Sequence, residues 1–110
     1  MIDVLFRGDT IEFECDVGEN ISGWKIRAEL YGKDFSIKKA TSNSGGSDNQ
    51  IKITDALNGK FVICFGKDET KNCSGVATLE IEMETPEGKI YTVYQGKFKF
   101  EEAKIDWLTP

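Results

Sequence analysis

Apolar and polar residues alternate along most of this chain, as they do in β-strands with one face in a core and the other in water. The alternation is clearest over residues 10–17, 24–30, 60–65 and 76–84. We expect the apolar side of these strands and of the last strand to form a core between two sheets, built from Phe13, Trp24, Ile26, Phe61, Ile63, Leu79, Ile81 and Phe98.

The most strongly specified local feature lies between residues 51 and 65. Two β-rich runs, 51–54 and 60–65, are separated by five residues that end in Asn58-Gly59, and both residues of this pair tolerate a positive φ. Large apolar side chains occupy every second position of the second run. The sequence therefore predicts a hairpin whose second strand lines the core.

Weaker patterns complete the set of elements. We expect a short first strand over residues 2–6, a weaker strand over 35–41 and a long last strand over 89–101. At most a single helical turn fits within residues 67–71. Gly96, inside the last strand, indicates a bulge or a close backbone approach.

Seven or eight short strands without a long helix are typical of an all-β fold, and an antiparallel β-sandwich fits them best. A small closed barrel is the alternative. The 110 residues suffice for one domain with its own core. We place that domain at residues 1–101 and treat residues 102–110 as a C-terminal tail.

Charge and hydropathy narrow the classes of partner. The formal net charge of −5 argues against nucleic acid, because phosphate binding needs clustered Lys and Arg. No apolar run approaches the ~20 residues of a membrane helix, and the N-terminus lacks the apolar segment of a signal peptide. We expect no membrane insertion, and synthesis in the cytoplasm.

The reactive residue types are few. Histidine is absent, which removes the commonest general base and the commonest zinc ligand. Cys15, Cys64 and Cys73 are an odd number of cysteines without a CxxC spacing, so we expect three free thiols. Cys73 could be a nucleophile, but without a histidine to activate it we interpret it as a bystander thiol in a polar loop.

Acidic residues offer one candidate metal or carboxylate site. Glu80, Glu82 and Glu84 could hold a metal or act as the carboxylate pair of a glycosidase. Successive outward positions on one strand do not converge on one atom, however, and we interpret them as a solvated face.

Three loop segments have a functional and a simpler interpretation. Asp48, Asn49 and Asp55 carry calcium-type oxygens but lack the EF-hand spacing. Residues 7–9 spell a cell-adhesion tripeptide, yet they lie where a turn between strands is expected. Residues 42–47 are a Gly/Ser-rich connector or a binding loop. We assign no catalytic, cofactor-binding or metal-binding residue.

Aromatic and apolar residues near the C-terminus are the remaining candidates, because such residues dominate protein contacts. Tyr31 and Trp107 are scattered aromatics, and Tyr91 with Tyr94 is the one exposed cluster that we expect. Large apolar side chains in the tail need a cover, either from their own domain or from a neighbouring copy in a homo-oligomer. The predicted interface comprises Tyr91, Tyr94, Ile105, Trp107 and Leu108.

The order of several short motifs carries a family resemblance. The motifs are FRGDT at 6–10, ISGWKIRAEL at 21–30, IKITDALNGKF at 51–61, GVATLEI at 75–81, GK at 88–89 and GKF at 96–98. Over residues 6–100 this order resembles the immunoglobulin-like modules of bacteriophage tail and baseplate proteins, such as the N-terminal domain of the baseplate upper protein.

This resemblance implies a fold and a role. The fold would be an immunoglobulin-like sandwich of seven to eight strands. The role would be a non-enzymatic structural one in a virion tail, after synthesis in the bacterial cytoplasm. The expected partners are other tail or baseplate proteins or copies of the chain itself. An immunoglobulin-like binding module for a cell-surface glycan or a protein target, of adhesin or inhibitor type, is the alternative. An enzyme is the third and weakest hypothesis.

An immunoglobulin-like order of strands predicts where several residues should lie. Trp24 would be buried on the third strand. Cys15 would lie in the core facing Leu79 or Ile81, so no disulfide forms there. The third, penultimate and last strands would be neighbours, with an acidic stripe between two basic ones contributing ~0.2–1 kcal/mol for each cross-strand pair. The residues of these stripes are Lys25, Arg27, Glu80, Glu82, Glu84, Lys97 and Lys99.

Overall fold

The computed structural model describes residues 3–47 and 49–102, so the predicted tail contacts at Ile105, Trp107 and Leu108 lie outside the described residues. Within that range the regular secondary structure is mostly β-strand with almost no helix, as predicted. Its elements are β1 (Asp3–Phe6), β2 (Ile11–Asp16), β3 (Lys25–Gly32), β4 (Ser36–Ala40), β5 (Ile51–Asp55), β6 (Lys60–Phe65), α1 (Lys67–Thr70), β7 (Gly75–Glu84) and β8 (Ile90–Glu101), with 3-10 turns η1 (Ser42–Ser44) and η2 (Ala56–Asn58).

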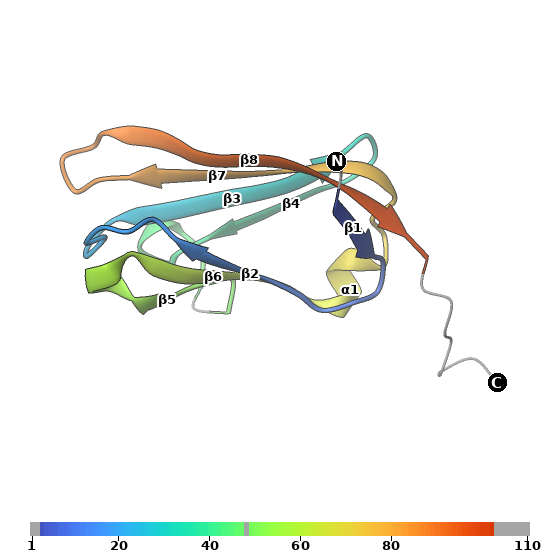
Figure 1. The fold of residues 1–110 in the computed structure, drawn as a ribbon, viewed down its shortest axis with the longest axis horizontal. Coiled ribbons are helices and arrows are strands. Elements are labelled where there is room, and N and C mark those ends of the chain that lie inside the picture. Colours follow the sequence, from blue (N-terminus) through green and yellow to red (C-terminus); the bar gives the residue numbers. More distant parts are fainter. Residues whose placement is uncertain (1–2, 48, 103–110) are drawn as a thin grey trace.

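The strands form two sheets that lie one above the other (Figure 1). The larger sheet has the order β1-β8-β7-β3-β4, and the smaller has the order β2-β6-β5. Because the strands form two separate sheets, the alternative of a small closed barrel is wrong. The third, penultimate and last strands are neighbours with β7 in the middle, as expected.

One strand pair corrects the expectation of a purely antiparallel fold. β1 runs parallel to β8, with Asp3 opposite Phe98 and Phe6 opposite Glu101. The chain leaves β1 through the turn at residues 7–9 and crosses to the other sheet, where it forms β2. No hairpin therefore constrains β1 to oppose its neighbour, and parallel pairing is allowed.

The core lies between the sheets, and six of its eight predicted members are buried. Phe13 and Trp24 are only partly buried, although both pack against the core. Phe13 lies on an edge strand, where its ring is 5.9 Å from that of Phe65 and 5.3 Å from that of Phe98. Trp24 precedes β3 by one residue, and its N–H donates to the carbonyl of Ile21 in a turn.

The predicted central hairpin is confirmed. Its turn differs from the type in which both Asn58 and Gly59 would have a positive φ. η2 connects β5 to β6, and only Gly59 has a positive φ, of 76°. Asn58 is the last residue of η2, and its side-chain amide donates to Asp55. The Gly59 backbone packs so closely on Glu19 that a Cβ atom there would lie 2.5 Å from the Glu19 carbonyl oxygen.

The β7–β8 hairpin carries the bulge that was expected near Gly96, but at another residue. Tyr94 lies opposite Ile81 and Thr92 opposite Glu82, so Val93 is the extra residue. Gly96 itself is in register, and the group closest to it is a side chain rather than the backbone that was the other expectation. The Tyr94 ring lies so near it that a Cβ atom at Gly96 would collide with the phenol.

The short helix α1 confirms the single predicted turn and packs on the turn at residues 7–9. Gly8 N–H donates to Thr70 Oγ1 at 3.0 Å, and that hydroxyl donates to the Asp9 carbonyl at 2.6 Å. Cys73 follows α1 and is fully buried, which corrects its placement in a polar loop. All three cysteines are free.

Candidate functional site

The clearest candidate site is the edge of the sandwich where β8 and β2 lie. β1 pairs only with Phe98–Glu101, so within residues 3–47 and 49–102 no strand covers the outer edge of residues 90–97. β2 is likewise the end strand of the smaller sheet and pairs only with β6. The two sheets therefore both end on this side with unpaired backbone.

Four large apolar side chains are exposed along the uncovered part of β8. Ile90, Tyr91, Val93 and Tyr94 keep between 39% and 57% of their surface in water. Tyr91 and Tyr94 lie opposite Met83 and Ile81, two core residues of β7, so both start from the inner face of the sheet. The structure thus places the predicted pair Tyr91 and Tyr94 together, at the mouth of the core.

Two hollows, of about 280 and 510 Å³, open between these edges and share Val17 and Val93 in their walls. We call their union the edge groove. Its apolar floor and walls are formed by Phe13, Cys15, Val17, Trp24, Phe61, Leu79, Ile81, Met83, Tyr91, Val93 and Tyr94. Such a lining, mostly apolar with a few polar groups, is typical of binding sites in proteins.

The charged side chains around the edge groove are mostly acidic. Glu14, Asp16, Glu19 and Glu87 line it against a single cation, Lys89. We call these four carboxylates the acidic rim. Among the described residues none of the four takes part in an ion pair. The rim therefore presents unpaired negative charge to whatever enters the groove.

Cys15 contributes a thiol to the edge groove. Burial raises its pKa, which lowers the fraction of reactive thiolate at neutral pH. Cys15 lines the same hollow as Leu79 and Ile81, but it is only partly buried and packs against the core, which corrects its expected position within the core. Its role there is apolar lining.

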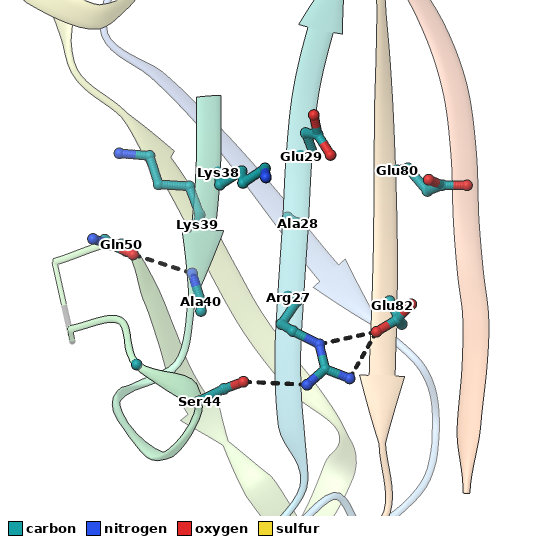
Figure 2. A pocket seen from close by; sticks show the side chains of 11 residues that line it. Arg27, Ala28, Glu29, Lys38, Lys39, Ala40, Ser44, Gln50, Glu80 and Glu82 are labelled. Carbon is teal, nitrogen blue, oxygen red and sulfur yellow. Dashed lines mark hydrogen bonds and ion pairs between the residues drawn. The ribbon is translucent and has the colours of Figure 1, made fainter. Parts of the chain in front are cut away.

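A third hollow, of about 500 Å³, lies over β3 and β4 and is polar (Figure 2). Arg27 dominates it: its Nη2 lies 2.7 Å from Glu82 and 3.0 Å from Glu84, and its Nη1 donates to Ser44. Hydrogen bonds from Arg27, first to Glu84 and then to Glu82, raise the pKa of the guanidinium further. The charges of Arg27, Glu82 and Glu84 therefore satisfy one another.

Of the two basic stripes predicted beside the acidic one, the structure confirms only the stripe on β3. Lys25 and Arg27 lie opposite Glu84 and Glu82, as expected. Lys97 and Lys99 lie opposite Thr78 and Val76 instead, beyond the acidic stripe. The hairpin places them there because Glu84 pairs with Ile90 at its start, and the lysines come seven and nine residues later.

The β4 edge shows how this protein protects an exposed strand. Lys39 points inward from it and binds Glu69, and Gln50 Oε1 accepts a hydrogen bond from Ala40 N–H at 3.1 Å (Figure 2). Inward charges and covering side chains are common ways to block strand addition. Residues 90–96 of β8 carry no charged side chain at all.

Asp48 lies outside the described residues, and the other described candidates are not brought together into a site. Asp55 accepts a hydrogen bond from the Asn58 side chain, and residues 7–9 form the predicted turn, with Gly8 at φ 85°. Tyr31 lies near the far end of β3, away from the edge groove. Sequence reasoning missed Val93 and the acidic rim, because the bulge and the β2–β8 proximity that join them are tertiary features.

The described residues contain no group of three or more acidic or cysteine side chains arranged to hold a metal. None of their helices is both long and apolar enough to cross a membrane. No family model matches this chain, and a search of curated proteins found no match.

Proposed function

We propose that this chain is an immunoglobulin-like sandwich that serves as a non-enzymatic structural module of a bacteriophage or prophage tail or baseplate. It acts through protein–protein contacts with other tail or baseplate proteins or with copies of itself. The observation that carries the contact role is the edge groove, where exposed tyrosines and valine border an apolar floor.

The strand order supports the immunoglobulin-like assignment. β3, β7 and β8 are neighbours in one sheet, and β2, β6 and β5 form the other, in the arrangement of strands C, F, G and B, E, D of such sandwiches. β4 extends the first sheet next to β3, as an extra strand does in the variable type. The position of β1 beside β8, away from β2, departs from the constant-type order.

The phage assignment rests on the order of the sequence motifs, and the local structure of two of them is consistent with scaffold roles. The motif at residues 51–61 builds the β5–β6 hairpin, where Gly59 meets the Glu19 backbone. The motif at 96–98 begins with the glycine under the Tyr94 ring. Side chains in these motifs pack or turn the chain, which suits a module that works by assembly.

Mass spectrometry of particles tests this proposal. Phage particles would be induced from the source bacterium, purified on a density gradient and separated into tail and head fractions. We expect the chain in the tail fraction, at a constant ratio to other tail proteins. Its presence only in the soluble lysate, with no tail genes beside its own gene, would contradict the virion role.

A glycan-binding module is the second candidate, favoured by one observation. Tyr91 and Tyr94 are both about half exposed and lie beside carboxylates at the edge groove. Aromatic faces with nearby hydrogen-bond acceptors suit sugar rings. A glycan array discriminates the two: saturable binding that Tyr91→Ala abolishes would favour the sugar site, and a blank array would favour protein contacts.

A further inference from the structure

We propose that the edge groove binds an extended segment of a partner protein, which adds as a strand to the free edge of β8 at residues 90–97. The segment would place alternate apolar side chains into the groove and carry Lys or Arg beside them. This inference deepens the proposed function and rests on its protein–protein contact.

The position for an added strand is already defined by β1. β1 occupies the outer side of β8 from Phe98 to Glu101, and the same side of residues 90–97 is uncovered within the described residues. A strand there would lie in line with β1 and would satisfy the free backbone N–H and C=O groups of β8. Main-chain hydrogen bonds of this kind provide affinity without needing a particular sequence.

The groove beneath that position selects the side chains. In an added strand every second side chain would point toward the inner face of the larger sheet. On that face Val93, Tyr94, Leu79 and Ile81 line one hollow. The bulge at Val93 brings Val93 and Tyr94 into the walls of the same hollow. Two or three apolar side chains of the partner would cover these residues and the exposed Tyr91.

The acidic rim determines the charge of the partner. Four carboxylates and one lysine give the groove lining a charge of −4 + 1 = −3. A partner with Lys or Arg on either side of its apolar residues would neutralise this charge and be steered to it. A second copy of this chain would bring its own acidic rim to the contact, and like charges there disfavour it.

The bulge also argues against self-pairing through β8. Two long regular edges pair most readily, and an extra residue at Val93 interrupts the even spacing of the β8 edge. A short partner segment can pair on either side of the interruption. These features together favour a basic, extended segment of a different protein.

The test uses the full chain and three fluorescein-labelled peptides with basic ends, KVTVTVK, KITITIK and KFTFTFK. Each has an acidic counterpart with Glu at both ends. We expect at least one basic peptide to bind saturably in fluorescence anisotropy and its acidic counterpart to bind about tenfold more weakly. Amide chemical-shift changes should map to residues 90–97 and to β2.

Two matched pairs of variants locate the site. Val93→Asp puts a charge in the groove and should raise the Kd at least about tenfold. Val76→Asp changes an exposed valine beside Lys99, outside the groove lining, and should leave the Kd unchanged. Glu14→Lys on the rim should weaken the basic peptide about threefold, whereas Glu12→Lys on the same strand, outside the groove lining, should not.

Several outcomes would overturn the proposal. One is that none of the basic peptides binds, and another is that Val76→Asp weakens binding as much as Val93→Asp does. Amide hydrogen exchange of the free protein supplies the last test. The informative amides are those of residues 90–97 that do not bond to β7 and point to the outer edge. Slow exchange of these amides that does not vary with concentration would make the chain's own terminus the occupant, and slow exchange only at high concentration would make it a second copy. The particle experiment can succeed while these fail, so the two proposals are separable.

Discussion

Replacing Glu69 by Gln should destabilise the protein by removing one charge of its most buried ion pair. Both carboxylate oxygens of Glu69 lie 2.7 Å from Lys39 Nζ, and one of them also accepts a hydrogen bond from Gly66 N–H at 2.9 Å. Lys39 points inward from the edge strand β4, with only 8% of its side chain exposed and its Nζ 5.5 Å from the Phe65 ring centre. Glutamine keeps the shape and loses the charge.

The size of the effect follows from burial. Removing one partner of a fully buried ion pair costs about 3–5 kcal/mol, because the other charge remains unpaired. Glu69 keeps 37% of its side chain exposed, so water can solvate Lys39 in part after the change. We therefore expect a loss of about 2 kcal/mol, near the value of about 1.5–3 kcal/mol for a hydrogen bond to a charged group. At about 4 °C per kcal/mol for a domain of this size, Tm should fall by about 8 °C.

The pH dependence provides an independent check. Burial alone would raise the pKa of Glu69, but the hydrogen bonds from Lys39 and Gly66 and the Lys39 charge lower it below 4.5. A carboxylate with a lowered pKa in the folded state stabilises the protein above its ordinary pKa and loses that effect as pH falls through the folded value. The difference between wild type and Glu69→Gln should thus be complete above about pH 5 and should shrink below pH 4.5.

Urea unfolding followed by circular dichroism between pH 3 and 8 measures both effects. Lys38→Met is the matched control, because Lys38 is the neighbouring lysine on β4, points outward and is exposed. It should change the free energy of unfolding by less than about 0.5 kcal/mol. Equal effects of Glu69→Gln and Lys38→Met, or a Glu69→Gln effect independent of pH, would refute the reasoning.

Three further changes test the packing of the fold. Gly59→Ala should cost about 1–2 kcal/mol more than Gly88→Ala, because both glycines have a positive φ but only at Gly59 would the new Cβ meet backbone, and paired urea titrations measure the difference. Phe61→Ala should cost about 3–5 kcal/mol by the same assay, while the exposed Leu57→Ala should stay within about 0.5 kcal/mol; similar values would contradict the central position of β6. Burial, and next the Glu69 carboxylate, raise the pKa of the Cys73 thiol, so at pH 8 Cys73 should react with a thiol reagent only after unfolding, as peptide mass mapping would show.

The elements of this protein could be predicted from the sequence because they depend on local patterns. An alternation of apolar and polar residues identifies a half-buried strand wherever it occurs, and β6 and β7 were found in this way. Turn chemistry is also local, so the position of the β5–β6 hairpin followed from Asn58-Gly59. The buried and exposed faces of these strands were predicted for the same reason.

Positions that depend on neighbours distant in sequence could not be predicted in this way. Cys73 has polar residues on both sides and is nevertheless buried, because it joins the core cluster and its thiol donates to the Glu69 carbonyl of α1. Trp24 has the spacing of a strand residue, yet a hydrogen bond to Ile21 holds it in a turn. In each case a tertiary contact outweighs the local preference.

The candidate site was predictable only in part, for the same reason. Tyr91 and Tyr94 could be identified as a pair because they are close in sequence and aromatic. Their meeting with Val17 and the acidic rim depends on which sheet each strand joins, and on β1 stopping short along β8. Side-chain alternation states which face of a strand is buried, but it carries no information about which strand lies beside it. The uncovered edge of β8 is therefore a property of the tertiary structure alone.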